Sequence, residues 1–180
     1  MAFERLSREL AYEGAIIDVY RDRVQMPYGR VAEWDFIGHK GAAAVVPVLE
    51  DGRILMVRQY RNAIDRYTLE IPAGGRNTLE EDTAVCAVRE LEEEAGCRCG
   101  ELELLIKLKT AVAFCNEFID VYVARSLTRT SQHLDEDEFI DVEAHPLGEL
   151  LEMIYAGELQ DAKTVAALLA YSGKYASAGK

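Results

Sequence analysis

The chain has 180 residues, of which 49% are hydrophobic, and its formal net charge at pH 7 is -12. This length suits one domain with a hydrophobic core, and the composition argues against a disordered chain. Proteins that bind nucleic acids need a basic surface for the phosphate backbone, so the acidic balance disfavours that class of partner. The longest uncharged apolar run, residues 42–49, is too short to cross a membrane. The first residues carry no signal-peptide core, and the four cysteines show no paired metal-ligand spacing, so we expect a reduced, cytoplasmic protein.

Five strands are expected in the first half of the chain. They cover residues 14–26, 31–37, 42–49, 53–60 and 67–71. A turn at residues 27–30 joins the first two strands, and the next two form a hairpin around Glu50-Asp51-Gly52. The fifth strand leads into the loop Pro72-Ala73-Gly74-Gly75, where the glycines let backbone carbonyls turn toward a ligand.

A helix is expected over residues 81–95, because apolar residues recur there at spacings of three and four and Gly96 then ends the pattern. The remaining elements are strands at 102–110, 118–124 and 139–144, an acidic loop at 126–138, and closing helices at 146–156 and 162–175. Strands, an internal helix, and then more strands and helices are typical of an α/β fold with a mixed sheet between helices.

The predicted helix carries many carboxylates. Glu90 and Glu94 lie one turn apart on the same face, and Glu93 lies beside them. Like charges at this spacing destabilise a helix by about 0.2–0.5 kcal/mol per pair, so they are expected either to take up protons or to bind a cation. Carboxylate oxygens suit Mg²⁺ or Mn²⁺. The alternative is an ordinary solvated acidic face.

The spacing of this segment resembles the Nudix box. Gly75 is followed after five residues by Glu81, and after seven more by Arg89-Glu90-Leu91-x-Glu93-Glu94-x-Gly96-Cys97. In the Nudix family this box is a loop–helix–loop that holds divalent cations for attack on a phosphoric anhydride. Cys97 departs from the larger aliphatic residue that is usual at the last position, which affects packing more than chemistry.

The resemblance implies roles for the box residues. Glu90 and Glu94 are expected to bind the metal, and Glu93 to act as a further ligand or as a contact to the attacking water. The carbonyl of Ala73 is an expected additional ligand. Arg89 is expected to pair with Glu81 and so to hold the helix against the loop.

Segments outside the box resemble the ADP-ribose pyrophosphatase branch of the family. They are Arg58-Gln59-Tyr60-Arg61, Glu70-Ile71-Pro72-Ala73-Gly74, Phe114-Cys115-Asn116-Glu117 and Asp161-Ala162-Lys163-Thr164. The resemblance implies the Nudix fold, an α/β/α arrangement with a mixed β-sheet between helices and an N-terminal antiparallel strand region. It also implies that residues 1–40 lie at a homodimer interface and that residues 41–180 form the hydrolase domain.

Two departures from this branch leave alternatives open. The stretch from Gly74 to Glu81 is one residue longer than usual, so either Gly74 or Gly75 is the box glycine. Val112 and Ala113 stand where many members carry a proline, which leaves the exact substrate open.

Further site residues are implied by the resemblance. The general base is expected in the loop over residues 133–139, as Glu138 or, second, Glu136; the alternative is a solvated acidic loop. Arg61, with Arg58 on the same strand, suits a bidentate contact to pyrophosphate. The other expected substrate contacts are Trp34, Glu70 and Glu117. Trp34 would stack on the adenine ring, and its alternative is an ordinary half-buried strand residue. The alternative for Glu117 is a hydrogen bond at the edge of the core.

Together these features predict a Mg²⁺-dependent Nudix hydrolase, with Mn²⁺ as a substitute, that acts on a small nucleotide-sugar substrate. The expected reaction converts ADP-ribose to AMP and ribose 5-phosphate. Three alternatives are a pyrophosphatase for GDP-mannose or another nucleotide sugar, a sensor that binds ADP-ribose without cutting it, and an enzyme that removes oxidised nucleotides. The sensor is disfavoured because the box retains its carboxylates.

Overall fold

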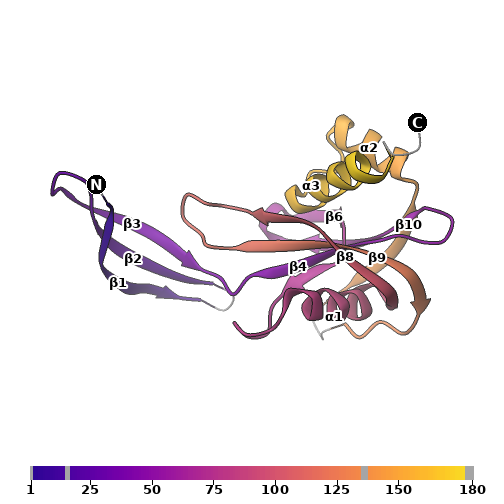
Figure 1. Cartoon of the computed structure of the whole chain (residues 1–180), viewed down its shortest axis with the longest axis horizontal. Helices are drawn as coiled ribbons and strands as arrows, with labels where there is room; N and C mark the ends of the chain where they lie inside the picture. Colours follow the sequence, from indigo (N-terminus) through magenta and orange to yellow (C-terminus); the bar gives the residue numbers. More distant parts are fainter. Residues whose placement is uncertain (1, 15–16, 135–137, 177–180) are drawn as a thin grey trace.

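A computed structural model describes residues 2–14, 17–134 and 138–176 of the chain (Figure 1). The strands are β1 Glu4–Glu13, β2 Asp18–Gln25, β3 Val31–Gly38, β4 Ala42–Pro47, β5 Ile54–Arg61, β6 Arg66–Glu70, β7 Ala73–Gly75, β8 Cys97–Lys109, β9 Phe118–Arg129 and β10 Ile140–His145. The α-helices are α1 Thr83–Ala95, α2 Leu147–Ala156 and α3 Ala162–Tyr171, with a 3-10 turn at Asn62–Ile64 and a π-helical turn at Ser172–Ala176. Within the described residues, no helix has the length and hydropathy needed to span a membrane.

The strands form three sheets, in the orders β1-β2-β3, β10-β5-β6 and β7-β4-β9-β8. The last sheet is mixed, because β4 runs parallel to β9 and antiparallel to β7. In Figure 1, α1 covers one face of the central strands, α2 and α3 cover the other, and β1–β3 project away from this body. The predicted α/β/α arrangement with an N-terminal antiparallel strand region is therefore confirmed.

Strand β4 divides the hydrophobic core into two halves. Ala44 and Val46 contribute to a cluster that includes Leu150 of α2 and Leu168 of α3. Ala43 and Val45 of the same strand belong to the opposite cluster, which contains the apolar side chains of α1. Successive side chains of a strand point to opposite faces, so one short apolar strand supports helices on both sides.

Helix α1 begins at Thr83, two residues later than predicted. Asp82 precedes it and accepts a hydrogen bond from the N–H of Ala84 at 2.7 Å, which satisfies one of the unpaired donors of the first turn. Gly96 ends the helix in the left-handed conformation with a φ of 58°, as the sequence predicted. The box helix is thus bounded at both ends by its own local sequence.

Several strand predictions need correction. Strand β1 was not predicted, because its alternating charged and apolar residues are largely exposed and carry little hydrophobic signal. The segment Ala73–Gly75, predicted as a loop, pairs with β4 as the short strand β7. Strand β9 continues to Arg129, into the region predicted to be an acidic loop, because it pairs there with β8.

The turn around Gly52 forms as predicted, but the strands beside it separate. The N–H of Leu49 donates to the carbonyl of Arg53 at 2.8 Å, and Gly52 has a φ of +83°. One isolated bridge, between Val48 and Ile54, follows. Beyond this bridge β4 and β5 belong to different sheets, because β4 pairs with β7 and β9 whereas β5 pairs with β6 and β10.

Candidate active site

Two box carboxylates lie on the buried face of α1. Glu90 is 8% exposed and Glu94 is 4% exposed, and they alternate with the core residues Ala87 and Leu91. Burial raises the pKa of Glu90 to about 7 and that of Glu94 to about 8. The negative charge of Glu138 raises both values further. These two carboxylates are therefore not part of a solvated acidic face, which was the alternative left open by the sequence.

Arg89 connects the box helix to the preceding loop. Its guanidinium reaches Glu81 at 3.3 Å, Glu90 at 2.6 Å and Glu93 at 2.8 Å. It also donates to the carbonyl of Gly75 at 2.9 Å. The predicted pair between Arg89 and Glu81 is confirmed, and the same side chain also offsets part of the negative charge of the helix.

Strand β7 presents backbone groups to the buried carboxylates. The N–H of Val45 bonds to the carbonyl of Pro72 at 2.9 Å, so the next residue, Ala73, directs its N–H and C=O away from β4. The N–H of Ala73 donates to Glu94 Oε2 at 2.8 Å. The carbonyl expected to bind a metal therefore lies on the same edge of β7 as this bond.

The two candidate box glycines have different surroundings. A β-carbon on Gly74 would overlap the carboxylate of Glu90, whereas one on Gly75 would meet no atom within 4 Å. Close approach of backbone and carboxylate therefore requires glycine at position 74. Gly75 contributes through its carbonyl, which accepts a hydrogen bond from Arg89.

The donor set fits a hard divalent cation. Glu90, Glu94 and the Ala73 carbonyl offer oxygen atoms, the ligand type preferred by Mg²⁺ and Mn²⁺. The raised pKa values of the two carboxylates show an electrostatic cost that a bound cation would relieve. Among the described residues, no three acidic, histidine or cysteine side chains are already gathered in a metal-binding geometry. One oxygen of Glu90 is instead held by Arg89, and one of Glu94 by the N–H of Ala73.

Glu70, expected to contact substrate, lies at the centre of a buried ionic cluster. Its side chain is 2% exposed and accepts two hydrogen bonds from Arg61, at 2.8 and 2.7 Å, and one from Thr68 at 2.6 Å. Lys163 of α3 is also bonded to it. Burial alone would raise the pKa of Glu70, but Arg61 and Lys163 outweigh this effect and lower it to about 2.

Lys163 and Thr164 also belong to the site region, although the sequence alone indicated no role for them. Thr164 is fully buried, and its hydroxyl accepts a hydrogen bond from the N–H of Ile71 at 3.0 Å. Asp161 caps α3 by accepting from the N–H and the hydroxyl of Thr164. The start of α3 is thereby attached to the chain two residues before Ala73. A polar pair separated by more than ninety residues leaves no periodic signal in a sequence.

Arg58 and Arg61 line one cleft of about 710 Å³, together with Thr68, Glu70 and Asp161. Arg58 is paired with Glu143 of β10. The pKa of Arg61 is raised first by its hydrogen bond to Glu70 and also by the charge of Glu94. The structure therefore brings Arg61 close to the box carboxylates, and it holds Arg58 in a separate ion pair.

Of the two candidates for the general base, only Glu138 lies in the described part of the chain. Glu136 lies outside the described residues. Glu138 acts on the pKa values of both Glu90 and Glu94, so it lies near the box carboxylates. Earlier in the chain, Gln132 Nε2 donates to the carbonyl of Glu94, near the end of α1, at 2.6 Å.

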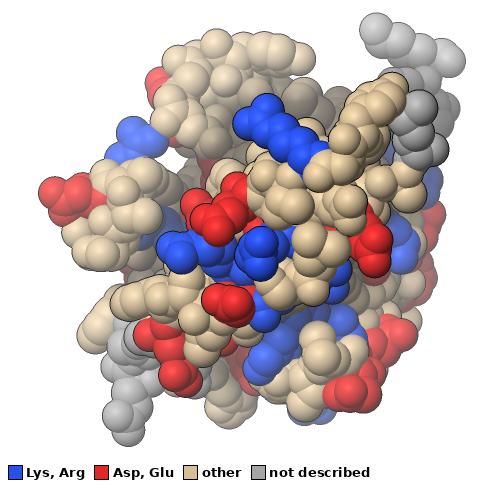
Figure 2. All heavy atoms as spheres, turned by 90° about the vertical axis from the view of Figure 1, so that its left-hand side faces the viewer, with Lys and Arg blue, Asp and Glu red and all other residues tan. Residues whose placement is uncertain are grey.

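The contacts of Trp34 and Glu117 lie outside α1. Trp34 lies on β3 of the projecting sheet, is 47% exposed, and has its ring centroid 6.0 Å from that of Phe3. Glu117 bonds to the hydroxyl of Thr110 and lies 3.5 Å from His39, neither of which belongs to α1. Seen from the end with the projecting sheet, Lys and Arg side chains are interleaved with Asp and Glu (Figure 2).

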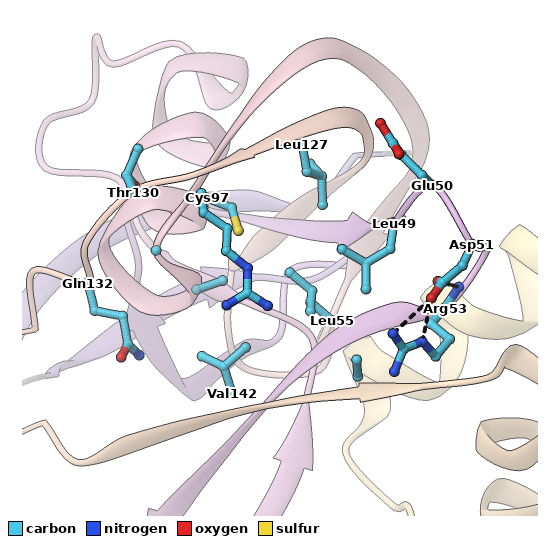
Figure 3. A pocket seen from close by; sticks show the side chains of 14 residues that line it. Leu49, Glu50, Asp51, Arg53, Leu55, Cys97, Leu127, Thr130, Gln132 and Val142 are labelled. Atoms are coloured by element: carbon cyan, nitrogen blue, oxygen red, sulfur yellow. Dashed lines mark hydrogen bonds and ion pairs between the residues drawn. The ribbon is translucent and has the colours of Figure 1, made fainter.

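A separate pocket of about 730 Å³ lies beside the end of α1, where Cys97, Thr130 and Gln132 line it (Figure 3). Arg53 and Asp51 form an ion pair at its rim, with a separation of 2.8 Å. Of the predicted site residues, it includes Gly96. This pocket is therefore distinct from the cluster around Glu90 and Glu94.

Comparisons with known proteins identify the family of the chain. The family model described as the NUDIX domain matches residues 38–168. The methanol dehydrogenase activator of Bacillus methanolicus is 37% identical over 165 residues, which cover 91% of this chain and 89% of that protein. The ADP-ribose pyrophosphatase of Bacillus subtilis (strain 168) is 35% identical over 165 residues, with the same coverage of both proteins.

A solved structure supports the fold. The crystal structure of an ADP compounds hydrolase superposes with a TM-score of 0.87 over 99% of this chain and 97% of that one, at 22% sequence identity. Members of the Nudix family generally use a divalent metal. The chain belongs to the Nudix family and is a Nudix hydrolase, an enzyme class that acts on the pyrophosphate of nucleoside diphosphate derivatives.

Proposed function

We propose that this enzyme hydrolyses ADP-ribose to AMP and ribose 5-phosphate with Mg²⁺ as its cofactor. One observation carries the proposal: Glu90 and Glu94 are buried side by side on α1, against the backbone of Ala73, with pKa values well above the ordinary range. Buried carboxylates of this kind are stabilised by a cation, and a cation lets an acidic protein accept a pyrophosphate. The similarity to an ADP-ribose pyrophosphatase supports the choice of substrate.

In this proposal Glu90, Glu94 and the carbonyl of Ala73 hold the metal, and Glu93 is a further ligand or a contact to the attacking water. When bound, Mg²⁺ supplies Lewis-acid polarisation of the phosphoryl oxygens and neutralises their charge; Mn²⁺ would substitute for it. Arg89 keeps Glu93 and the carbonyl of Gly75 in place through its hydrogen bonds.

The remaining residues bind the substrate and move a proton. Glu138, with Glu136 as the alternative, accepts the proton of the water whose oxygen attacks a phosphorus atom. The phosphorus–oxygen bond of the anhydride then breaks, and the two phosphates leave on AMP and on ribose 5-phosphate. Arg61 presents a guanidinium to the pyrophosphate oxygens. Arg58 is an outer contact in the same cleft.

We also propose that residues 1–40 form a homodimer interface, outside the hydrolase domain of residues 41–180. The projecting sheet exposes apolar side chains, namely Phe3, Leu6, Leu10, Tyr12 and Trp34. A three-stranded sheet with such a surface favours a covering partner. A second copy would also bring Trp34, and with it Glu117 at the base of the sheet, toward bound substrate. Light scattering coupled to size exclusion tests this proposal, and a monomeric mass at working concentration would contradict it.

A substrate panel tests the proposed reaction. ADP-ribose, GDP-mannose, UDP-glucose, NADH and diadenosine polyphosphates are incubated with the enzyme, with and without Mg²⁺, and phosphatase-coupled phosphate release is measured. GDP-mannose is included because Val112 and Ala113 replace a proline that many relatives carry. We expect ADP-ribose to give the highest kcat/KM and the rate to require Mg²⁺. A higher kcat/KM for GDP-mannose, or binding of ADP-ribose without turnover, would overturn the substrate assignment.

A further inference from the structure

Two cations from distant parts of the chain share the carboxylate of Glu70. Arg61, the last residue of β5, donates from both Nε and Nη2, at 2.8 and 2.7 Å. Lys163, in the first turn of α3, bonds to the same carboxylate and to Asp161 at 3.0 Å. Glu70 itself ends β6, so this single side chain links three elements. The two parallel hydrogen bonds hold the guanidinium plane in one orientation.

The exposure of these side chains separates a contact residue from a supporting one. Arg61 exposes 42% of its side chain, whereas Glu70 exposes 2% and Lys163 exposes 12%. A substrate in the cleft therefore meets Arg61 and does not reach the carboxylate behind it. Lys163 bonds to both Glu70 and Asp161, so the two cations and the two carboxylates of the cluster balance in charge.

The same cluster also fixes the chain that leads to the metal-binding backbone. The hydroxyl of Thr164 accepts from the N–H of Ile71, the residue that follows Glu70. The backbone of Ala73, two residues further on, bonds to Glu94. Three hydrogen-bonded attachments thus connect the start of α3, the end of β6 and the box helix.

We propose that Glu70 is a positioning residue, which orients Arg61 toward the pyrophosphate with Lys163 as its counter-charge, and that it is not a substrate contact. The inference rests on the proposed function, in which Arg61 receives the phosphate oxygens. A guanidinium that must be ordered at the moment of binding costs conformational entropy, and a pre-ordered one avoids that cost. The effect of losing Glu70 should therefore fall on substrate binding.

The test compares wild type with Glu70→Gln, Glu70→Asp and Arg61→Ala. We expect Glu70→Gln to raise KM for ADP-ribose about tenfold while kcat changes less than about threefold, which is the signature of lost uniform binding. Glu70→Asp keeps the charge but shortens the side chain, so it should raise KM as well. In an Arg61→Ala background, Glu70→Gln should add little further increase in KM, because the oriented group has already been removed.

Asp51→Asn is the matched control. Asp51 is paired with Arg53 just before the start of β5, at the rim of the separate pocket (Figure 3), and this change should leave KM and kcat as in wild type. A wild-type KM for Glu70→Gln, or effects on KM that add fully to those of Arg61→Ala, would overturn the inference. If wild type hydrolyses no substrate of the panel, the proposed function fails instead, so the two failures are distinguishable.

Discussion

Gly74 and Glu90 are packed so closely that a β-carbon on the glycine would overlap the glutamate carboxylate. The glycine belongs to β7 and the glutamate to α1, so this contact sets how near the box helix approaches the strand. Any larger residue at position 74 must push the proposed metal ligand out of place.

Gly74→Ala is therefore expected to disturb the site more than the fold. We expect a loss of about 1–3 kcal/mol in the free energy of unfolding, as for other overpacked contacts, and about a 10–100-fold weaker apparent affinity for Mg²⁺ in the activity assay. Gly75→Ala is the matched control, because nothing lies within 4 Å of the added carbon. Equal effects of the two substitutions would contradict the packing argument.

Glu94→Gln is expected to remove metal-dependent turnover while the fold remains. The neutral amide keeps the shape of the side chain and costs less to bury than the carboxylate, but it is a poor ligand for Mg²⁺. We expect kcat to fall at least about a hundredfold, and Mn²⁺ binding followed by electron paramagnetic resonance to weaken in parallel. Glu92→Gln, on the same helix, is the control, since Glu92 pairs with Arg98 away from the site. Activity like wild type in Glu94→Gln would refute the ligand assignment.

Arg89→Ala should destabilise the protein more than Arg98→Ala, although both remove an arginine that pairs with α1 carboxylates. Arg89 is 24% exposed and bonds to three glutamates, while Arg98 is 66% exposed and bonds to Glu92. We expect losses of about 2–3 kcal/mol for Arg89→Ala and below about 0.5 kcal/mol for Arg98→Ala, measured by urea unfolding. Similar losses would mean that the Arg89 contacts contribute no more than a surface pair.

The pH dependence of stability should contain a contribution from Glu70. Its pKa is lowered from 4.5 to about 2, so the ionised form stabilises the folded state above pH 4.5, and this stabilisation is lost as the pH falls from about 4.5 to about 2. The full contribution is roughly 3 kcal/mol, at about 1.4 kcal/mol for each pH unit. Urea unfolding of wild type and Glu70→Gln should show a difference that is largest near pH 7 and shrinks below pH 4.5. A difference that is constant with pH would contradict the assignment.

Glu138→Gln should slow turnover more than it weakens substrate binding. Loss of a general base lowers kcat by about 10²–10⁴-fold, and we expect KM to stay within about threefold of wild type. Glu136→Gln is the comparison variant, because it changes the other glutamate of the same loop in the same way. A larger kcat effect for Glu136→Gln would transfer the role of base to that residue, and an effect of Glu138→Gln on KM alone would exclude it.

The local sequence was sufficient for the box helix and for the chemistry it suggests. Asp82 and Gly96 bound α1 through contacts with their immediate neighbours, and the spacing of Glu90 and Glu94 places them on one face of any helix. The order of the expected elements along the chain also predicted the mixed sheet between helices. The helix and its two ends depend on residues a few positions apart, where the physics of turns and helix ends is local.

The tertiary structure decided the features that depend on pairing and packing between distant parts of the chain. It identified Gly74 rather than Gly75 as the glycine under Glu90, formed β7 from a predicted loop, and separated β4 from β5. It also joined Glu70 to Arg61 and Lys163 in a buried cluster. Hydrogen bonds and steric contacts between residues up to ninety-three positions apart produce these results, and such contacts depend on how the elements meet in space rather than on any neighbouring sequence.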